Sequence, residues 1–272
     1  MFSKYPEFID TDPRTGRSST RSYNINQEFL ERRYTAFFEN INLEGKTILD
    51  LGSCVSSLGA WVLDKGAKHY HGVEYDETLC NLAKANLSKY FKDWTISQEY
   101  FEDFFLNNTE EFDIIIASGV IYGYDDPSLF IDEITKLSDT IILESRHPVG
   151  RWLMESEFET EVYLPKTYIE MMEKLPLVVY YPKNAFMLYS DTKTSAKFNG
   201  SCPTKGFVDY YFDIKGYSNQ QEFQQSCEEK CPEVYNNTKR YACLYIKQHE
   251  PKSFGFKTSI ENNDFTEQEF IK

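Results

Sequence analysis

The hydrophobic positions of the first half of the chain fall into short apolar runs separated by amphipathic stretches. The runs have the length and composition of parallel strands buried on both faces. They lie at residues 47–51, 94–98, 113–116 and 140–144. A helix is predicted after Pro127, where apolar residues are spaced to face a sheet at Leu129, Phe130, Ile134 and Leu137. Strands that alternate with helices, joined by right-handed crossovers, predict an α/β fold with a doubly wound, mostly parallel sheet.

The loop after the first of these strands contains the first candidate chemistry. It reads Asp50-Leu51-Gly52-Ser53-Cys54-Val55-Ser56, and Gly52 lets the chain turn sharply and approach a ligand closely. Glu74 closes the next predicted strand, about 20 residues further on, where an acid can accept both hydroxyl protons of a ribose. The pattern favours a bound adenosine. The alternative is that Asp50 caps the following helix and Glu74 is a solvated strand end.

This segment resembles the cofactor-binding motif of the class I S-adenosylmethionine-dependent methyltransferases, whose first loop runs Asp-x-Gly-x-Gly-x-Gly. Here the first glycine is present, and Cys54 and Ser56 replace the second and third. A pyrophosphate needs glycines where it touches the backbone, whereas a methionine moiety carries no phosphate and suits an acid at Asp50. The replacements therefore favour S-adenosyl-L-methionine over NAD. The resemblance implies a Rossmann-like methyltransferase fold with a seven-stranded sheet.

The segment FDIIIASGVIYGYDDP, at residues 112–127, is the second motif of the resemblance. Ser118 and Gly119 end its strand beside the expected methyl group, and Gly123 stands where one subgroup carries a histidine, which excludes a histidine base there. Because Tyr100 occupies the usual adenine-binding acid position, that role passes to Glu102 or Asp103, with Phe101 packing on the purine. The cofactor site is thus predicted at Asp50, Gly52, Ser53, Cys54, Ser56, Glu74, Tyr75, Phe101, Glu102, Ser118 and Gly119.

Methyl transfer is an in-line displacement, so much of its acceleration can come from alignment in a dry site. A base is needed only if the acceptor is a hydroxyl or a protonated amine. His147 is the first choice for proton transfer, and Tyr122 and Tyr124 are the other catalytic candidates, with Glu144 also within reach of the strand ends.

The N-terminal residues 1–45 are predicted to form an arm and a lid helix. Arg14, Arg17 and Arg21 are opposed locally only by Asp12, and arginine suits planar recognition of carboxylate or phosphate. Arg17 and Arg21 are therefore substrate-binding candidates, the alternative being a solvated arm. A helix is predicted at residues 26–38, and in this superfamily such a helix commonly covers the cofactor.

The catalytic domain is predicted to span residues 46–250 and to be followed by a polar tail, 251–272. A helix is predicted at 166–175, and strands at 177–181 and 241–247 fit the antiparallel edge pair of the family. The intervening residues 182–240 are interpreted as a substrate-side insertion near the sheet edge. Its segment FVDYYFDI suggests another strand with a wall of rings, and Tyr210 and Arg146 complete the substrate-binding candidates.

Composition and charge narrow the class of protein. A chain of 272 residues with 41% hydrophobic content can bury a large core, and the net charge of -14 argues against a long nucleic-acid duplex as partner, although not against tRNA. No apolar run approaches about 18 residues and no secretory signal is visible, so a cytoplasmic protein without membrane spans is expected. Six cysteines without a Cys-x-x-Cys pair predict neither a structural zinc nor disulfides. Oligomeric state is left open.

Three functions remain. The leading hypothesis is an S-adenosylmethionine-dependent methyltransferase acting on a small molecule, and an anionic acceptor would suit the arginines. The second is a methyltransferase that modifies tRNA or protein, because the Ser-Gly-Val-Ile-Tyr run resembles enzymes of both kinds. The third is a non-catalytic S-adenosylmethionine-binding protein, prompted by Cys54, Ser56 and Gly123.

Overall fold

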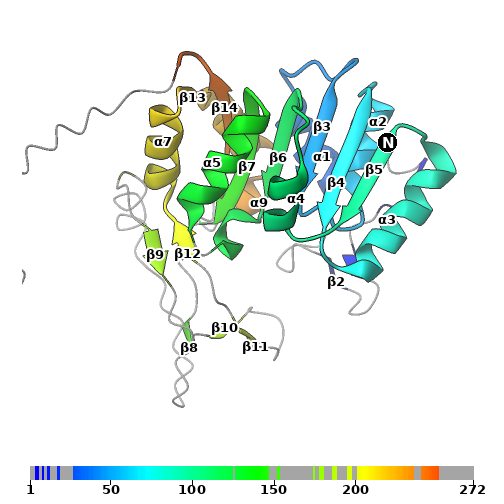
Figure 1. The fold of residues 1–272 in the computed structure, drawn as a ribbon, viewed down its shortest axis with the longest axis horizontal. Coiled ribbons are helices and arrows are strands. Elements are labelled where there is room, and N and C mark those ends of the chain that lie inside the picture. The colour runs from blue at the N-terminus through cyan, green and yellow to red at the C-terminus, as the bar shows by residue number, and fades with distance from the viewer. Residues whose placement is uncertain are drawn as a thin grey trace, which may run out of the picture.

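A single seven-stranded sheet with helices on both faces organises the computed structural model (Figure 1). The structure describes residues 4–5, 8, 11–12, 17–18, 27–124, 126–146, 152–153, 174, 178–180, 186–188, 195–197, 201–235 and 240–250. The strands are β3 (Thr47–Leu51), β4 (His69–Glu74), β5 (Trp94–Gln98), β6 (Ile114–Ser118), β7 (Thr140–Arg146), β13 (Tyr217–Asn219) and β14 (Arg240–Lys247).

The order across the sheet is β13-β14-β7-β6-β3-β4-β5. The five strands from β5 to β7 run parallel to one another, whereas β14 is antiparallel to both β7 and β13. The predicted doubly wound, mostly parallel seven-stranded sheet is therefore confirmed. Because the chain winds from β3 towards β5 and then from β6 towards β7, the switch point lies between β3 and β6. Open α/β sheets bind ligands outside the carboxyl ends of the strands at this point.

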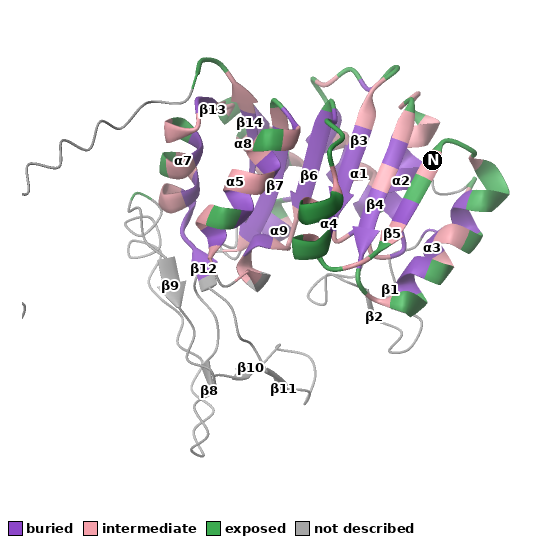
Figure 2. Ribbon diagram, in the orientation of Figure 1, coloured by how far each residue is buried: buried purple, intermediate pink, exposed green. Residues whose placement is uncertain are grey.

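The helices divide between two hydrophobic cores, one on each face of the sheet. One face is covered by α1 (Gln27–Phe38), α2 (Ser57–Asp64), α3 (Glu77–Tyr90), α8 (Gln221–Lys230) and α9 (Pro232–Tyr235). The other is covered by α4 (Phe101–Asn107), α5 (Pro127–Leu137) and α7 (Lys205–Ile214), with the short 3-10 helix η2 (Ile121–Gly123) at the end of β6. Figure 2 shows the central strands buried between these layers.

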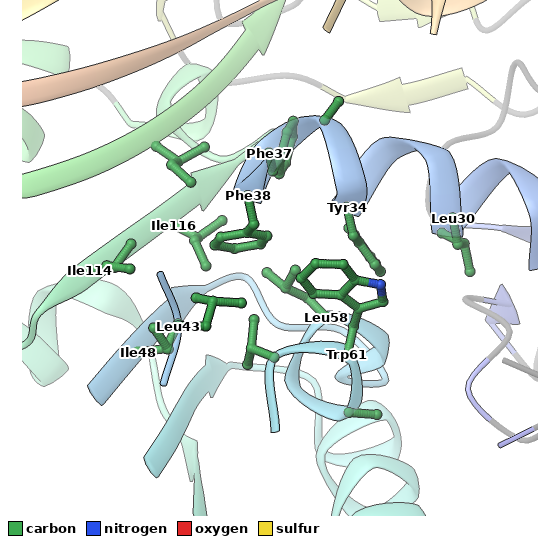
Figure 3. Close-up of a cluster of buried hydrophobic side chains, with 14 of the residues drawn as sticks. Leu30, Tyr34, Phe37, Phe38, Leu43, Ile48, Leu58, Trp61, Ile114 and Ile116 are labelled. Carbon is green, nitrogen blue, oxygen red and sulfur yellow. The ribbon is translucent and has the colours of Figure 1, made fainter. Parts of the chain in front are cut away.

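The helix α1 is fixed to the sheet by aromatic packing. The rings of Phe38 and Trp61 stack at 5.3 Å between centroids, and Tyr34 meets Trp61 edge-on at 6.1 Å (Figure 3). Burying a side chain of this size contributes about 2 kcal/mol. Trp61 belongs to α2, which follows the cofactor loop, so this packing also holds α1 beside that loop.

Most predicted elements of the first half agree with the structure. The strands at 47–51 and 94–98 have the predicted bounds, and α1 begins one residue after the predicted helix. Asp126 caps α5 by accepting the amide proton of Ser128 at 2.8 Å. One detail is wrong: Leu129 is 57% exposed, because it lies about 100° around the helix from the buried Phe130.

The second half requires two corrections. The segment FVDYYFDI forms the helix α7 and not a strand, since Thr204 caps it through the amide of Phe207 at 3.1 Å and its buried residues Val208 and Phe212 recur at helical spacing. The edge strand beside β14 is β13, not residues 177–181. The strand β9 (Val178–Tyr180) instead pairs with β12 (Ser201–Pro203) in a separate two-stranded sheet.

Several other segments bear on the expected domain layout. The described part of residues 182–240 supplies β13 to the central sheet and α7 and α8 to its two faces. The predicted helix at 166–175 lies outside the described residues, apart from Lys174, as does the tail 251–272.

The remaining strands are short. They are β1 (Thr11–Asp12), β2 (Arg17–Ser18), β8 (Trp152–Leu153), β10 (Phe186–Leu188) and β11 (Ser195–Lys197). No helix among the described residues has the length and apolarity needed to cross a membrane. All six cysteines lie among the described residues, where they are reduced thiols.

Candidate functional site

A cavity of about 380 Å³ opens at the carboxyl edge of the sheet, over the switch point. It is bounded by the ends of β3, β4 and β6, by α1 and by the start of β14. Most of the cofactor-binding residues predicted from the sequence line it. They are Asp50, Gly52, Ser53, Cys54, Glu74, Tyr75, Phe101, Ser118 and Gly119.

The first loop keeps a glycine-type backbone although two of its glycines are replaced. Gly52, Cys54 and Ser56 all have positive φ angles, of 77°, 51° and 58°. A left-handed conformation costs a residue with a Cβ about 1–2 kcal/mol, so Cys54 and Ser56 are held there by the surrounding structure. A Cβ at Gly52 would lie 2.5 Å from Cγ1 of Val120, so that glycine is required sterically as well.

The acid at the end of β4 is oriented by two backbone donors. Oε2 of Glu74 accepts the amide proton of Cys54 at 3.1 Å, and Oε1 accepts that of Asp76 at 3.0 Å. Burial raises the pKa of Glu74, while the two amide donors oppose that rise. Glu74 is only 6% exposed, which contradicts the alternative of a solvated strand end. Its carboxylate is placed to accept hydroxyl protons of a ribose in the cavity.

Asp50 is also buried at the cavity wall. Its Oδ2 accepts the hydroxyl proton of Tyr70 at 2.7 Å, and burial raises the pKa of that tyrosine well above its ordinary value. The helix that follows the loop has Ser56, not Asp50, at its N-cap position. The alternative role of Asp50 as a helix cap is therefore wrong.

Aromatic rings form the wall on the adenosine side. Phe101 lines the cavity and lies parallel to Tyr124 with 6.1 Å between centroids. Tyr75 lines it as well and stacks on Tyr100 at 5.5 Å. Two predicted cofactor residues do not line the cavity. Ser56 is buried behind the loop, and Glu102 points into solvent from the first turn of α4.

The opposite end of the cavity contains a buried polar network around Glu144. Arg33, from α1, donates to Ser118 at 2.6 Å and forms an ion pair with Glu144. Ser118 and Tyr235 also donate to that carboxylate, and Arg240 lies 3.8 Å from its Oε1. Burial alone would raise the pKa of Glu144, but Arg33, Arg240 and Ser118 together lower it. Glu144 is thus a fixed carboxylate with its oxygens engaged, which makes it a poor general base.

The catalytic candidates differ in position. Tyr122 lines the cavity. Tyr124 does not, because it packs behind Phe101 against Phe130 at 4.8 Å, and burial raises its pKa far above the ordinary value. His147 lies outside the described residues.

The substrate-binding candidates are also separated by the structure. The guanidinium of Arg146 lies 4.2 Å from the ring centroid of Tyr122, beside the cavity. Tyr210 is half exposed on α7, on the face of the sheet opposite α1, and does not line the cavity, because its segment is a helix packed on α5. Arg17 is described only through its backbone in β2, and Arg21 lies outside the described residues.

Comparison with known proteins places this geometry in a family. A model of the methyltransferase domain matches residues 42–176. No sequence among the curated proteins matches this chain significantly. The chain thus contains a methyltransferase domain of the class I S-adenosylmethionine-dependent superfamily. It is accordingly an enzyme whose cofactor is S-adenosyl-L-methionine.

Solved structures with the same fold include a protein assigned as an S-adenosylmethionine-dependent methyltransferase from Listeria monocytogenes. It is 16% identical, with a TM-score of 0.51, over 82% of this chain and 98% of that chain. Magnesium protoporphyrin IX methyltransferase from Synechocystis PCC 6803 is 14% identical, with a TM-score of 0.47, over 82% and 79%. A protein assigned as an RNA methyltransferase from Pyrococcus horikoshii is 13% identical, with a TM-score of 0.41, over 83% and 84%.

The residues of this methyltransferase fit its cofactor. Glu74, held by two backbone amides, would accept the hydroxyl protons of the ribose, and the cavity-lining Asp50 would present a negative charge to the ammonium and sulfonium. Gly52 and Gly119, both with positive φ, keep the strand ends open, because a Cβ at either position would meet a neighbouring side chain within 3.5 Å. When bound, the cofactor would supply an electrophilic methyl group, and these residues would hold its carrier.

Sequence reasoning missed the part played by Arg33, Arg240 and Tyr235. Arg33 interrupts the apolar stripe of α1 between Phe29 and Phe37, and an arginine at a buried helix position requires an acid partner from elsewhere. That interruption was the available signal. No local pattern indicates that the partner is Glu144, which is 111 residues away in the chain.

Proposed function

We propose that this methyltransferase transfers the methyl group to a compact small-molecule acceptor. The cavity of about 380 Å³ is near the lower end of the range for ligand pockets, about 300–1,000 Å³. The ion pair between Arg33 and Glu144 closes one end of it with buried side chains. Because the same cavity must also hold the cofactor, the room left for the acceptor is small, which suits a compact acceptor group.

The observation that carries the proposal is a group of acids at the carboxyl edge of the sheet, next in sequence to the cavity-lining Tyr75 or close to Phe101, here called the acidic rim. Its members follow β4 and β5 or lie in the first turns of α3 and α4. They are Asp76, Glu77, Glu99, Glu102 and Asp103, all exposed or half exposed. A tRNA extends well beyond its modified base, so its phosphates would be repelled by the acidic rim and by the net charge of -14.

The chemistry of the site also suits a compact acceptor. Ser118 and Gly119 border the place where the methyl group is expected, at the end of β6. Glu144 is held as a carboxylate by Arg33, so it orients the site and takes up no proton from the acceptor. Tyr122 is the cavity-lining candidate for proton transfer, and His147 stays a prediction. Alignment of the acceptor with the methyl carbon and sulfur supplies the main part of the acceleration.

The test is transfer of label from S-adenosylmethionine carrying a radioactive methyl group. The purified protein is incubated separately with a deproteinised small-molecule extract, with total tRNA and with a protein extract. We expect label in the small-molecule fraction and none above background in the other two. Asp50→Ala is the control variant, because it removes a carboxylate of the cofactor site.

Two outcomes would overturn the proposal. Label in tRNA or protein would show that the acceptor is a macromolecule. Retained binding of the demethylated cofactor, without transfer to any of the three pools, would favour the non-catalytic binding protein prompted by Cys54, Ser56 and Gly123.

A further inference from the structure

We infer that the acceptor carries a carboxylate or phosphate group and that Arg240 binds this group at the end of the cavity opposite the adenosine. The inference rests on the proposed function, because it names the chemical class of the small molecule. It goes further than that function because it assigns the anionic group of the acceptor to the side chain of Arg240. Arg33 and Glu144 act as positioning residues that hold the surrounding network.

The charged residues that line the cavity are segregated by sign. Asp50 and Glu74 lie at the ends of β3 and β4, on the side expected to hold the adenosine and the positive groups of the cofactor. Arg33 and Arg240 lie on the other side, from α1 and β14. A ligand with an anionic group would therefore be oriented with that group towards the arginines.

The antiparallel strands β7 and β14 lie at this end of the cavity, which Arg240 of β14 lines. Arg240 and Arg146 lie directly opposite each other in the antiparallel pairing of β14 with β7. Side chains directly opposite in such a pair have Cβ atoms about 4.5–5.5 Å apart, and like charges there destabilise the sheet. Glu144 offsets part of that repulsion through Arg240, and an anion bound at the end of this strand pair would offset it further.

The two arginines that ion-pair with Glu144 are placed differently. Arg33 donates to both Ser118 and Glu144, and its side chain is 8% exposed. Arg240 is more exposed, at 18%, and its Nη1 lies 3.8 Å from Glu144, at the limit of an ion pair. An anion can therefore approach Arg240 while the contact between Arg33 and Glu144 stays intact. A guanidinium also matches the planar geometry of a carboxylate or phosphate.

The position of Gly119 relates this anion site to the reaction. A Cβ built on Gly119 would lie 3.5 Å from Nη1 of Arg240 and 3.3 Å from the hydroxyl of Tyr122. The guanidinium and the phenol thus flank the same point at the end of β6, where the methyl group is expected. An acceptor that binds Arg240 and presents its nucleophile to the methyl group must therefore carry the nucleophile within a few bonds of its anionic group.

The carboxylate of the cofactor itself has the same chemistry as the group inferred for the acceptor, so the experiment must separate the two. Calorimetry first measures binding of S-adenosylhomocysteine and of 5′-methylthioadenosine, which lacks the amino-acid carboxylate. The protein saturated with S-adenosylhomocysteine is then titrated with benzoate, with its neutral counterpart benzamide and with inorganic phosphate. The proteins compared are the wild type, Arg240→Gln and Arg32→Gln. Arg32 is the matched control, because it pairs with Glu233 outside the cavity.

We expect the wild-type complex to bind at least one of the two anions, benzoate or phosphate, at least tenfold more tightly than benzamide. Arg240→Gln should abolish that preference and leave the affinity for S-adenosylhomocysteine within twofold of the wild type. Arg32→Gln should behave as the wild type. Arg240→Lys, which keeps the charge without the planar fork, should retain part of the preference and provides a second variant if Arg240→Gln does not fold.

The inference is overturned if neither anion binds the wild-type complex better than benzamide does. It is also overturned if Arg240→Gln weakens S-adenosylhomocysteine tenfold and leaves 5′-methylthioadenosine unaffected, because Arg240 would then bind the carboxylate of the cofactor. The proposed function fails in a different way, through label in tRNA or protein, and the anion titrations do not depend on that result.

Discussion

The backbone amide of Cys54 donates a hydrogen bond to Oε2 of Glu74 at 3.1 Å. This bond joins the first loop to the end of the neighbouring strand β4. Cys54 holds a left-handed backbone conformation, which aims its amide at the acid. The residue that replaces a family glycine therefore takes part, through its main chain, in fixing the carboxylate that we expect to bind the ribose.

We expect Glu74→Gln to weaken binding of S-adenosylhomocysteine by about 10- to 100-fold. The substitution removes the charge that strengthens hydrogen bonds to ribose hydroxyls, and hydrogen bonds to charged groups contribute about 1.5–3 kcal/mol. It also leaves the amide of Cys54 or Asp76 facing an NH₂ group. Titration calorimetry measures the effect, with the exposed Glu77→Gln as control. An unchanged affinity in Glu74→Gln would show that the ribose lies elsewhere.

The left-handed residues of the loop predict an unusual effect of glycine. We expect Ser56→Gly to be more stable than Ser56→Ala by about 1 kcal/mol, because both variants lose the hydroxyl and only alanine keeps the strain of a Cβ at a φ of 58°. In an ordinary helical or extended position the order would be reversed. Urea unfolding of the two variants measures the difference, and equal stabilities would mean that the loop stores no such strain.

The buried ion pair between Arg33 and Glu144 predicts strong coupling. Arg33→Met should lower the free energy of unfolding by about 3 kcal/mol, because Glu144 then remains buried with less compensation. The double variant Arg33→Met with Glu144→Gln should lose less than the sum of the single variants, with a coupling of about 1–3 kcal/mol. Denaturant unfolding of the wild type, the two single variants and the double variant measures the coupling energy. Additive effects would contradict a direct pair.

His71 predicts loss of stability in weak acid. Burial, and to a lesser degree the neighbouring His69, lower the pKa of His71 to about 4, and its ring lies against Phe104 and Phe112. In the unfolded chain this histidine takes up a proton at about pH 6.5, before the folded protein does. The free energy of unfolding should therefore fall by up to about 3 kcal/mol as the pH drops from about 6.5 to 4.

The contribution of His71 is isolated by comparing wild type with His71→Gln. Other groups that titrate in acid act on both proteins, so the difference between their unfolding free energies reports on this histidine. That difference should narrow as the pH is lowered from 7.5 to 4.5. A constant difference across this range would mean that His71 titrates normally in the folded protein.

The first half of the fold was predictable because its information is local. The strand at residues 47–51 is a continuous apolar run, and Gly52 and Glu74 follow their strands at the spacing that a mononucleotide-binding unit requires. The second half was harder. The edge strand β13 has only three residues, too few for a pattern, and the aromatic density of residues 207–214 concealed the helical spacing of Val208 and Phe212.

The sequence by itself determined the α/β class, the alternation of parallel strands with helices and the edge expected to hold the cofactor, because the carboxyl ends of parallel strands meet at one rim. Only the tertiary structure decided the charged network at the other end of the cavity. Arg33, Glu144 and Arg240 come from a helix and two strands far apart in the chain, and nothing in the local pattern of one refers to the others. Their charges are paired only because the fold buries the three side chains together, and a buried charge must be compensated by an opposite charge or by hydrogen bonds.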